Sequence, residues 1–450
     1  MSVFRETAAA VSACICMFVT GCWLAWPSPA LRKLEVQGGA NVFIEGDEIS
    51  WVVASLDVGN MVSPIPASYL VDRIGRKPVL LATGPLYLIC WMLTFVPGTP
   101  YFLFLSRFLS GIGKGIAFSI CPMYLGEIAS VEVRGAISTI STGALWGGSL
   151  LMFIVGPLVS YQWLNTIGAI FPIIFFMTFL WIPESPYGCL MRNKVEEARK
   201  SLQWLREGAD QLAIEKELEQ MKENVEEEMK TKGTFVDLVA IPSNRKATTI
   251  VMVSSAFQRL CGISAVLAFS STTLPNVGFQ FFHVSQVIVV FGIVLTIGNF
   301  LATPLVDHLG RKPLLFASSI GLAISTATSG FYYLLRGDPE QAAWLPYMAL
   351  VCFGIFHSIG LGVIPSTLLS ELFPANVKSR AAAVSSIVFA AASFVTNKMY
   401  HPVQHSIGTH AMFFFFSMNA VIFTIFNALF IFETKGKSFP DIQKRLKSLK

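Results

Sequence analysis

Charged residues are scarce in this sequence. Only 14% of its 450 residues are Asp, Glu, Lys or Arg, whereas 53% are hydrophobic, and the mean hydropathy is +0.60. Soluble domains carry about 25% charged residues, so a soluble protein of this composition would expose too much apolar surface to stay in solution. The composition therefore excludes an ordinary soluble domain and favours a protein that lies in a lipid bilayer.

Several functional signals are absent as well. The sequence holds no Asn-x-Ser/Thr acceptor, no Ser-His-Asp set, no metal-ligand cluster and no nucleotide-binding motif. The net charge of +5 comes from basic residues in short loops without a basic face, which argues against a nucleic-acid partner. Seven of the eight cysteines fall inside apolar segments and Cys189 in a predicted cytosolic loop, which predicts no disulfides. We expect neither an enzyme nor a cofactor, and no obligate protein partner.

Long apolar segments dominate what is present. A helix that crosses a membrane needs about 20 mostly apolar residues. Twelve segments meet this need, at 7–27, 49–71, 79–97, 101–124, 137–160, 163–182, 247–271, 283–306, 314–335, 344–369, 381–401 and 411–432. They predict an all-α polytopic membrane protein with an N-terminal six-helix bundle (1–182), a cytosolic helical linker domain (183–246), a C-terminal six-helix bundle (247–432) and a cytosolic tail (433–450).

The polar interval between the two sets of six has a helical pattern. Segment 194–232 is rich in helix formers, with apolar residues at helical spacing that include Leu202, Leu205, Leu212 and Leu218. A disordered linker would not keep that spacing. We therefore expect short amphipathic helices at the membrane surface.

The distribution of Lys and Arg sets the orientation. The termini, the linker and the loops on the same side as the linker hold 26 of the 33 basic residues, while the opposite loops hold Arg32, Lys33, Arg336 and the nearby Lys398. Basic residues gather on the cytosolic side of membrane proteins. Both termini are therefore predicted to be cytosolic, in the plasma membrane or in an internal membrane.

The two sets of six segments share an internal repeat. VDRIGRKPVLLA (71–82) and VDHLGRKPLLFA (306–317) are identical at eight of twelve positions and follow the second span of each set. A second echo pairs an acid with a base seven residues later, Glu127 with Arg134 and Glu371 with Lys378. A parallel duplication of this kind is typical of alternating-access carriers, in which two halves rock around a central cavity.

The charges of the repeat suggest a latch at the cytosolic face. Gly75 and Gly310 permit tight turns, Asp72 and Asp307 can accept from nearby helix N-termini, and Arg76 and Arg311 can reach carboxylates across the interface between the halves. The alternative is positive charge that only sets the topology. The repeated acids favour the latch.

Seven motifs carry a resemblance to a known family. They are DRIGRK (72–77), RFLSGIGKGIAFSICPMYLGEIASVEVRG (107–135), PESP (183–186), QRLCGISAV (258–266), DHLGRK (307–312), SELFPANVKSR (370–380) and ETKGKS (433–438). In this order the motifs resemble the sugar-porter family of the major facilitator superfamily, and PMYLGEIA looks most like the insect facilitative sugar and trehalose carriers. The predicted gating network comprises Asp72, Arg76, Glu127, Arg134, Glu184, Asp307, Arg311, Glu371, Arg380 and Glu433.

The resemblance implies uniport of hexoses or disaccharides through a polar pocket built mainly from the C-terminal half. Gln258 stands at the first of the family's paired glutamines, but the other pocket positions are changed. The second glutamine is Arg259, the following asparagine Ser264, the fifth-span glutamine Thr142, the tenth-span tryptophan Ser366 and the eleventh-span Asn-Trp pair Phe389 and Ala390. Gln258, Arg259, Ser264, Thr142 and Ser366 are the predicted solute-binding residues, and the resemblance supports a carrier more firmly than a glucose carrier.

Two of these residues have alternative interpretations. Gln258 offers the donors and acceptors that a sugar needs, but it could instead form a hydrogen bond between helices. Arg259 could bind the solute or form an ion pair with Asp57 on the second span, because a cation inside a membrane normally has a partner or faces a cavity.

Three functions follow from these observations. The first is facilitated diffusion of a small sugar, because the first span holds no acid of the kind that the family's proton-coupled members use, although Asp57 and Lys114 lie within spans. The second is a carrier for a different solute such as an organic anion, because Arg259 replaces an amide and the aromatic platform is missing. The third is a sensor that binds sugar without transporting it.

Overall fold

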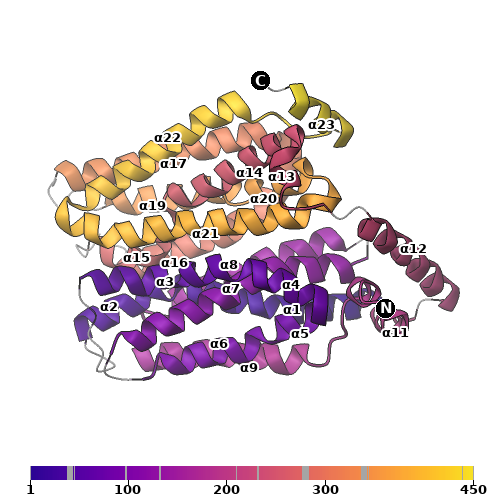
Figure 1. Ribbon diagram of the computed structural model, residues 1–450. Helices are drawn as coiled ribbons and strands as arrows, with labels where there is room; N and C mark the ends of the chain where they lie inside the picture. The colour runs from indigo at the N-terminus through magenta and orange to yellow at the C-terminus, as the bar shows by residue number, and fades with distance from the viewer. Residues whose placement is uncertain are drawn as a thin grey trace.

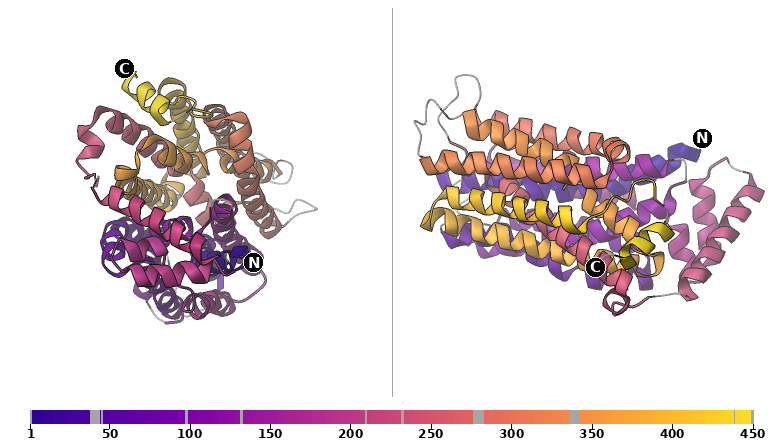
Figure 2. Two further views of the ribbon diagram at one scale, coloured as in Figure 1. Left: turned by 90° about the vertical axis from the view of Figure 1, so that its right-hand side faces the viewer. Right: turned by 90° about the horizontal axis from the view of Figure 1, so that it is seen from above.

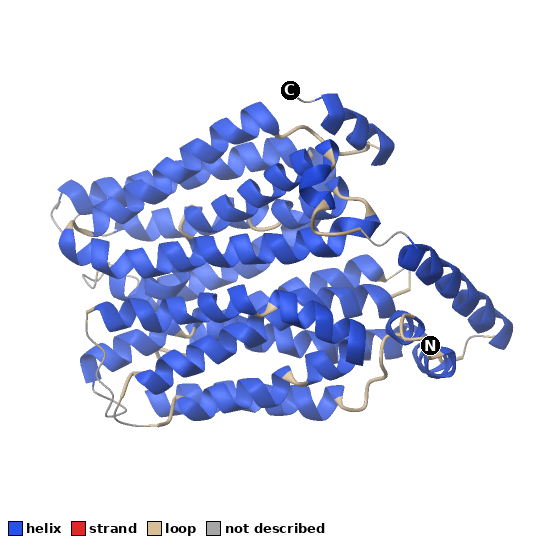
Figure 3. Cartoon of the chain, in the orientation of Figure 1, coloured by secondary structure: helices blue, strands red, loops and turns tan. Residues whose placement is uncertain are grey.

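The computed structural model describes residues 2–37, 44, 46–96, 99–130, 133–208, 210–230, 233–275, 283–335, 342, 344–437 and 439–448. Within these ranges all regular secondary structure is helical (Figure 3). Arg336, predicted to lie in a loop opposite the linker, falls outside the described residues.

Among the described residues, thirteen helices belong to the N-terminal half and the linker. The half contains α1 (Ser2–Ala25), α2 (Pro27–Gln37), α3 (Asp47–Val62), α4 (Pro64–Ile74), α5 (Arg76–Leu81), α6 (Thr83–Leu93), α7 (Tyr101–Ile128), α8 (Arg134–Val155) and α9 (Tyr161–Phe179). The linker contains α10 (Pro186–Leu190), α11 (Val195–Leu205), α12 (Gln211–Lys230) and α13 (Asp237–Ala240). The linker is thus helical as expected, although α12 has 20 residues, and its position at a membrane surface stays a prediction.

The C-terminal half repeats the pattern of the first. It contains α14 (Pro242–Leu260), α15 (Ile263–Thr273), α16 (Val284–Leu309), α17 (Arg311–Leu335), α19 (Trp344–Ile359), α20 (Ile364–Leu372), α21 (Ala375–Ser406) and α22 (Thr409–Phe430). A last helix, α23 (Phe439–Ser448), lies in the tail. Helices therefore occupy all twelve segments predicted to be spans.

Ten stretches of the described residues are long and apolar enough to cross a membrane. The second and third predicted spans fall short of that measure. Asp57 and Asn60 interrupt the apolar surface of α3, and α5 with α6 covers only Arg76 to Leu93 and begins with two basic residues. Polar groups of this kind inside a bundle face partners or cavities, so these two spans are expected to lie among other helices.

The two halves lie side by side (Figure 1). They meet where α3 packs along α21, α8 against α16, and α15 against α2. The linker helices α11 and α12 lie at one end of the bundle, and both chain termini lie at that end too (Figure 2). We call it the linker end and the other the opposite end.

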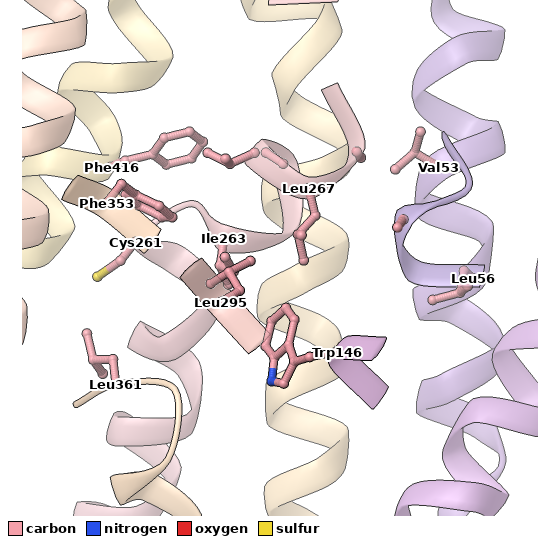
Figure 4. Close-up of a cluster of buried hydrophobic side chains, with 14 of the residues drawn as sticks. Val53, Leu56, Trp146, Cys261, Ile263, Leu267, Leu295, Phe353, Leu361 and Phe416 are labelled. Atoms are coloured by element: carbon pink, nitrogen blue, oxygen red, sulfur yellow. The ribbon is translucent and has the colours of Figure 1, made fainter. Parts of the chain in front are cut away.

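A shared apolar core joins the halves. Trp146 of α8 lies beside Ile263 of α15 and Leu295 of α16 in one buried cluster (Figure 4). Side chains from both halves thus pack together, and inside a bilayer van der Waals contact of this kind stabilises the association of helices. All eight cysteines are free thiols, and seven are buried.

The linker has a small core of its own. Leu202 and Leu218 are buried there with Cys189, and Leu205 is buried against the N-terminal half. Leu212, predicted to belong to the same apolar face, is instead 80% exposed. It lies in the first turn of α12, before the part of that helix that packs on α10 and α11.

A buried ion pair fastens the linker to the N-terminal half. Arg206, just after α11, lies 2.8 Å from a carboxylate oxygen of Glu6 and 2.8 Å from one of Glu217. Glu6 is fully buried, and its other oxygen accepts from the backbone N–H of Ser130 at 2.9 Å. Breaking a buried pair by removing one partner costs about 3–5 kcal/mol, so this contact holds the linker firmly.

Candidate functional site

A break inside the seventh predicted span creates a helix start within the bundle. Gly262 separates α14 from α15 and has a left-handed backbone (φ 106°), which L side chains rarely adopt. A Cβ at this position would lie 2.6 Å from the ring of Phe416. The first turn of α15 therefore begins deep in the C-terminal half, which the apolar sequence around it did not reveal.

Arg259 lies next to this helix start. Its side chain is almost wholly buried, and Nη1 donates to Oγ of Ser264 in the first turn of α15 at 3.1 Å. The guanidinium carbon lies 3.8 Å from the ring centre of Phe389 on α21, a close cation–π contact. Phe389 thus packs its ring on the guanidinium of Arg259, and the absence of the family's tenth-span tryptophan, at Ser366, stays as the sequence indicates.

Gln258 forms the hydrogen bond between helices that was its alternative interpretation. Its Nε2 donates to the carbonyl of Gly362, in the break between α19 and α20, at 3.1 Å. Gln258 is only partly buried. A role in binding the solute stays a prediction.

A row of polar side chains continues from Ser264 to the N-terminal half. Oγ of Ser393 donates to Oγ of Ser264 at 2.8 Å, and Nδ2 of Asn397 on the same helix donates to Oδ2 of Asp57 at 2.7 Å. The four side chains come from α15, α21 and α3 and are nearly fully buried. We call Arg259, Ser264, Ser393, Asn397, Asp57 and Lys114 the polar chain.

Lys114 ends the polar chain in the N-terminal half. Its ammonium lies 3.3 Å from Oδ1 of Asp57, and both side chains are 1% exposed. The proposed ion pair between Arg259 and Asp57 is therefore wrong. Asp57 is held by Lys114 and Asn397, which approach it from α7 and α21.

Arg107 lies beside the polar chain but belongs to the packing of the N-terminal half. It donates to the carbonyls of Trp23 at 2.6 Å and Val52 at 3.1 Å. Its guanidinium also lies 5.9 Å and 5.7 Å from the rings of Trp23 and Trp26. Carbonyl oxygens and aromatic faces thus balance this charge.

The two remaining predicted pocket residues lie on exposed helix surfaces. Thr142 is exposed on α8, and Ser366 is exposed on α20, where its Oγ donates to the carbonyl of Val363 at 2.6 Å. Their part in solute binding stays a prediction. Sequence reasoning missed Ser393 and Asn397, although Phe389, Ser393 and Asn397 recur every four residues and so share one face of α21.

The N-terminal repeat builds a charge cluster at the linker end. Nε and Nη2 of Arg76 donate to Oε1 of Glu127 at 3.1 and 3.0 Å. Oε1 of Glu184 accepts from the backbone N–H groups of Arg76 and Lys77 at 3.1 and 3.0 Å, at the start of α5. A carboxylate at a helix N-terminus satisfies donors that have no partner within the helix.

The C-terminal repeat builds the same arrangement. Nε and Nη2 of Arg311 donate to Oε1 of Glu371 at 3.1 and 2.8 Å. Glu433 accepts from the backbone N–H groups of Arg311 and Lys312, both at 3.0 Å, at the start of α17. Burial alone would raise the pKa of Glu433, but backbone donors from Arg311, Lys435, Lys312 and Thr434 together hold it below its ordinary value.

Two expectations about these clusters are wrong for this structure. Arg76 and Arg311 pair with carboxylates of their own halves and do not reach across the interface. Asp72 and Asp307 lie in the last turns of α4 and α16, before the glycine turns, so they cannot cap the helices that follow. Asp72 is exposed, and Asp307 pairs with Arg311 at 3.2 Å.

Arg380, another member of the predicted network, lies apart from the clusters. Arg380 donates to the carbonyl of Asn376 at 3.4 Å and lies 5.9 Å from the ring of Phe235 in the linker. Arg134 is the first residue of α8, and its side chain lies outside the described part of the chain.

Comparison with known proteins identifies the family. Residues 45–446 match the family described as "Sugar (and other) transporter". The chain belongs to this family. The resemblance seen in the motifs is thus confirmed, and with it the assignment as a polytopic sugar-porter protein of the major facilitator superfamily.

Insect sugar porters are among the similar proteins. The facilitated trehalose transporter Tret1 of Culex quinquefasciatus is 31% identical over 448 residues, which cover 98% of this chain and 86% of that protein. The transporter of the same name from Polypedilum vanderplanki is 32% identical, with 99% and 88% covered. The chain spans only 56% of the Anopheles gambiae transporter, at 30% identity.

Solved structures share the fold of these sugar porters. The inward-open conformation of the xylose transporter XylE from E. coli superposes with a TM-score of 0.79 at 19% identity, covering 99% of this chain and all of that one. XylE described as a proton:xylose symporter gives 0.77 at 20% identity. The major facilitator fold predicted from the repeat is thus confirmed.

Proposed function

We propose that the protein carries a small sugar, a hexose or a trehalose-like disaccharide, across a membrane by facilitated diffusion with alternating access. The observation that supports the proposal most is the polar chain, which runs between the two halves of a sugar-porter fold and places hydroxyl, amide and aromatic groups together. Hydroxyl and amide groups offer both donors and acceptors to sugar hydroxyls, and an aromatic face packs against the ring.

Contacts between the halves support a state open toward the linker end. Lys398 of α21 donates to Oγ of Ser50 at 2.8 Å and lies 3.4 Å from Asp47, both in the first turn of α3. Ser28 and Ser270 meet at 3.3 Å, also toward the opposite end. At the linker end each charge cluster stays within its own half, so the halves are free to rock about the contacts at the opposite end.

The charge clusters keep each half rigid while the halves move. In each cluster an arginine at the start of a helix, α5 or α17, pairs with a glutamate of the fourth or tenth span. A second glutamate, Glu184 or Glu433, caps the start of that helix. Asp72 is exposed on α4, which packs near α21 of the other half. In the proposed cycle Asp72 gains partners from the other half when the linker end closes.

Uniport is supported by the one acid of α1, which lies just before the predicted first span. α1 contains one acidic residue, Glu6, and both of its oxygens are engaged, by Arg206 and by the N–H of Ser130. A carboxylate tied in this way does not face the polar chain. The proposed location is the plasma membrane, with the linker and both termini in the cytosol, as the basic residues at the linker end favour.

Uptake into proteoliposomes tests the proposal. Saturable uptake of labelled trehalose or glucose is expected, unchanged when the proton gradient is collapsed and reduced at least 10-fold in Gln258→Ala. Gln162→Ala, on an exposed turn of α9, is the matched control and is expected to behave as wild type. Sugar binding without uptake would instead support a sensor, and no interaction with any sugar by folded protein would reject the proposal.

A further inference from the structure

One buried charge in the polar chain lacks an acidic partner. Lys114 and Asp57 neutralise each other at 3.3 Å, and Arg107 is surrounded by carbonyls and indole rings. Arg259 lies within ion-pair distance of no carboxylate among the described residues. A cation inside a membrane protein is retained at a cost in stability, so it normally serves a ligand or a pathway.

We propose that Arg259, Ser264 and the first turn of α15 form a binding site for a single negatively charged group, a carboxylate or a halide. The group is either part of the transported sugar, as in a sugar acid, or a separate small anion bound beside a neutral sugar. The inference rests on the proposed sugar-carrier function and names the chemistry that the solute site requires.

The first line of support is the unused donor of Arg259. Arg259 is only 7% exposed, and its Nε is buried without a hydrogen-bond acceptor. Leaving a buried donor of a charged group unsatisfied is unfavourable, which indicates that an acceptor belongs there. The ring of Phe389 covers the guanidinium face at 3.8 Å, so an acceptor must approach the edge of the guanidinium.

The second line of support is the direction of hydrogen bonding at Ser264. Its Oγ accepts from Nη1 of Arg259 at 3.1 Å and from Oγ of Ser393 at 2.8 Å. A hydroxyl has two acceptor sites and one donor. Both acceptor sites are therefore occupied, and the O–H of Ser264 is left to donate to something else.

The third line of support is the helix start itself. The first N–H groups of α15 have no acceptor within the helix and carry its positive partial charge. Glycine at position 262 lets the chain turn sharply enough for this start to lie next to Arg259. In transporters, the N-termini of half-helices near the midplane point at anionic parts of the substrate.

The number of uncompensated charges defines the ligand class. Only one cation of the polar chain lacks a counter-charge, so a singly charged group balances the site, whereas a phosphate with nearly two charges would not. A hydroxyl of a neutral sugar could accept from Nε, but a neutral sugar would leave the charge of Arg259 without a counter-charge. A carboxylate or a halide matches the site.

The test compares anions in purified proteoliposomes. Uptake of labelled glucose and trehalose is measured in chloride and in sulfate at matched ionic strength, and glucuronate is offered both as a labelled substrate and as a competitor. If the anion is separate, chloride is expected to raise neutral-sugar uptake at least 10-fold. If it is part of the solute, glucuronate is expected to be taken up, or to compete, at least 10-fold better than glucose.

Three variants assign the effect to Arg259. Arg259→Gln, which restores an amide, is expected to abolish the anion effect, and Arg259→Lys is expected to retain part of it. Lys222→Gln on the exposed side of α12 makes the same change in net charge far from the site and is expected to leave the anion effect intact. Thermal stability of the detergent-purified protein, in chloride, glucuronate and sulfate, gives a readout that needs no transport.

The outcomes separate the two proposals. The anion site would be overturned if neither chloride nor glucuronate changed the uptake of neutral sugar and neither anion stabilised the protein. The sugar-carrier proposal would then still stand. Failure to take up any sugar or sugar acid would reject the carrier. In that case the anion site would still be supported if chloride or glucuronate stabilised wild type and Arg259→Lys but not Arg259→Gln. If neither anion stabilised wild type, the site would be overturned too.

Discussion

Glu184 and Glu433 perform the same structural task in the two halves. Each accepts two backbone N–H groups at the start of the helix that follows a glycine turn, α5 in one half and α17 in the other. They lie in sequence motifs that share little beyond the acid, PESP and ETKGKS. The duplication is therefore more complete in space than in sequence.

Removing either carboxylate should weaken its cluster. Glu184→Gln and Glu433→Gln keep the size of the side chain but lose the charge of the acceptor. Hydrogen bonds to charged groups contribute about 1.5–3 kcal/mol each to stability. We expect both variants to unfold at lower temperature in detergent. Glu223→Gln, exposed on α12, serves as the control, and equal melting of all three variants would contradict the assignment.

The stability of the C-terminal cluster should depend on pH. Because folding lowers the pKa of Glu433, its contribution is fully present above the ordinary value of 4.5 and is lost as pH falls through the lower folded value. Wild type should therefore melt above Glu433→Gln at pH 7, and the difference should shrink below pH 4.5. A difference that grew as the pH fell would contradict this sign.

The Asp57–Lys114 pair should show strong coupling. Asp57→Asn leaves the buried ammonium of Lys114 without its counter-charge, which costs about 3–5 kcal/mol. Asp57→Leu combined with Lys114→Met removes both charges and should recover much of the lost stability, measured by thermal melting. If the losses of stability in Asp57→Leu alone and in Lys114→Met alone simply added in the double variant, the pair would not be coupled.

The backbone at Gly262 should not tolerate a side chain. Gly262→Ala forces a left-handed conformation, at about 1–2 kcal/mol, and brings a Cβ within 2.6 Å of Phe416. Reduced stability and reduced uptake are expected. Gly126→Ala, where a Cβ meets nothing within 4 Å, should resemble wild type, and an unaffected Gly262→Ala would show that the break is not needed.

Detaching the linker should expose it to protease. Arg206→Met removes the partner of the buried Glu6, so α11 and α12 should separate from the N-terminal half more often. Limited proteolysis should then cut the linker faster than in wild type. Arg199→Met, whose guanidinium lies in exposed ion pairs with Glu196 and Glu215, is the control, and equal cleavage of both variants would count against this anchor.

The sequence was sufficient to predict the helices and the repeat because both are local signals. Apolar runs of about 20 residues mark spans, and the shared DxxGRKP motif marks the duplication wherever the chain folds. The helix break at Gly262 was not predicted because apolar residues follow it, as they would in an unbroken span. Hydropathy does not report a left-handed turn.

The site could be predicted only in part because its partners are distant in sequence. Arg259 was correctly singled out as a buried cation and its neighbour Ser264 as a pocket residue. The contact of Arg259 with Phe389 and the pairing of Asp57 with Lys114 could not be predicted, since they join helices whose packing only the fold defines. The same limit explains Arg76 and Arg311. Their carboxylate partners were among the predicted residues, but the assignment to one half or across the interface depends on three-dimensional packing.

The eight free cysteines are expected to react slowly with thiol reagents, so the native chain suits site-specific chemical labelling. Seven are buried, Cys352 is only partly exposed, and burial raises the pKa of Cys189 to about 11, so its thiol stays protonated at neutral pH. A single cysteine introduced at an exposed position such as Asp72 should then carry most of the reaction with a polar maleimide. The rate of that reaction would report how often the linker end of the carrier is open to water.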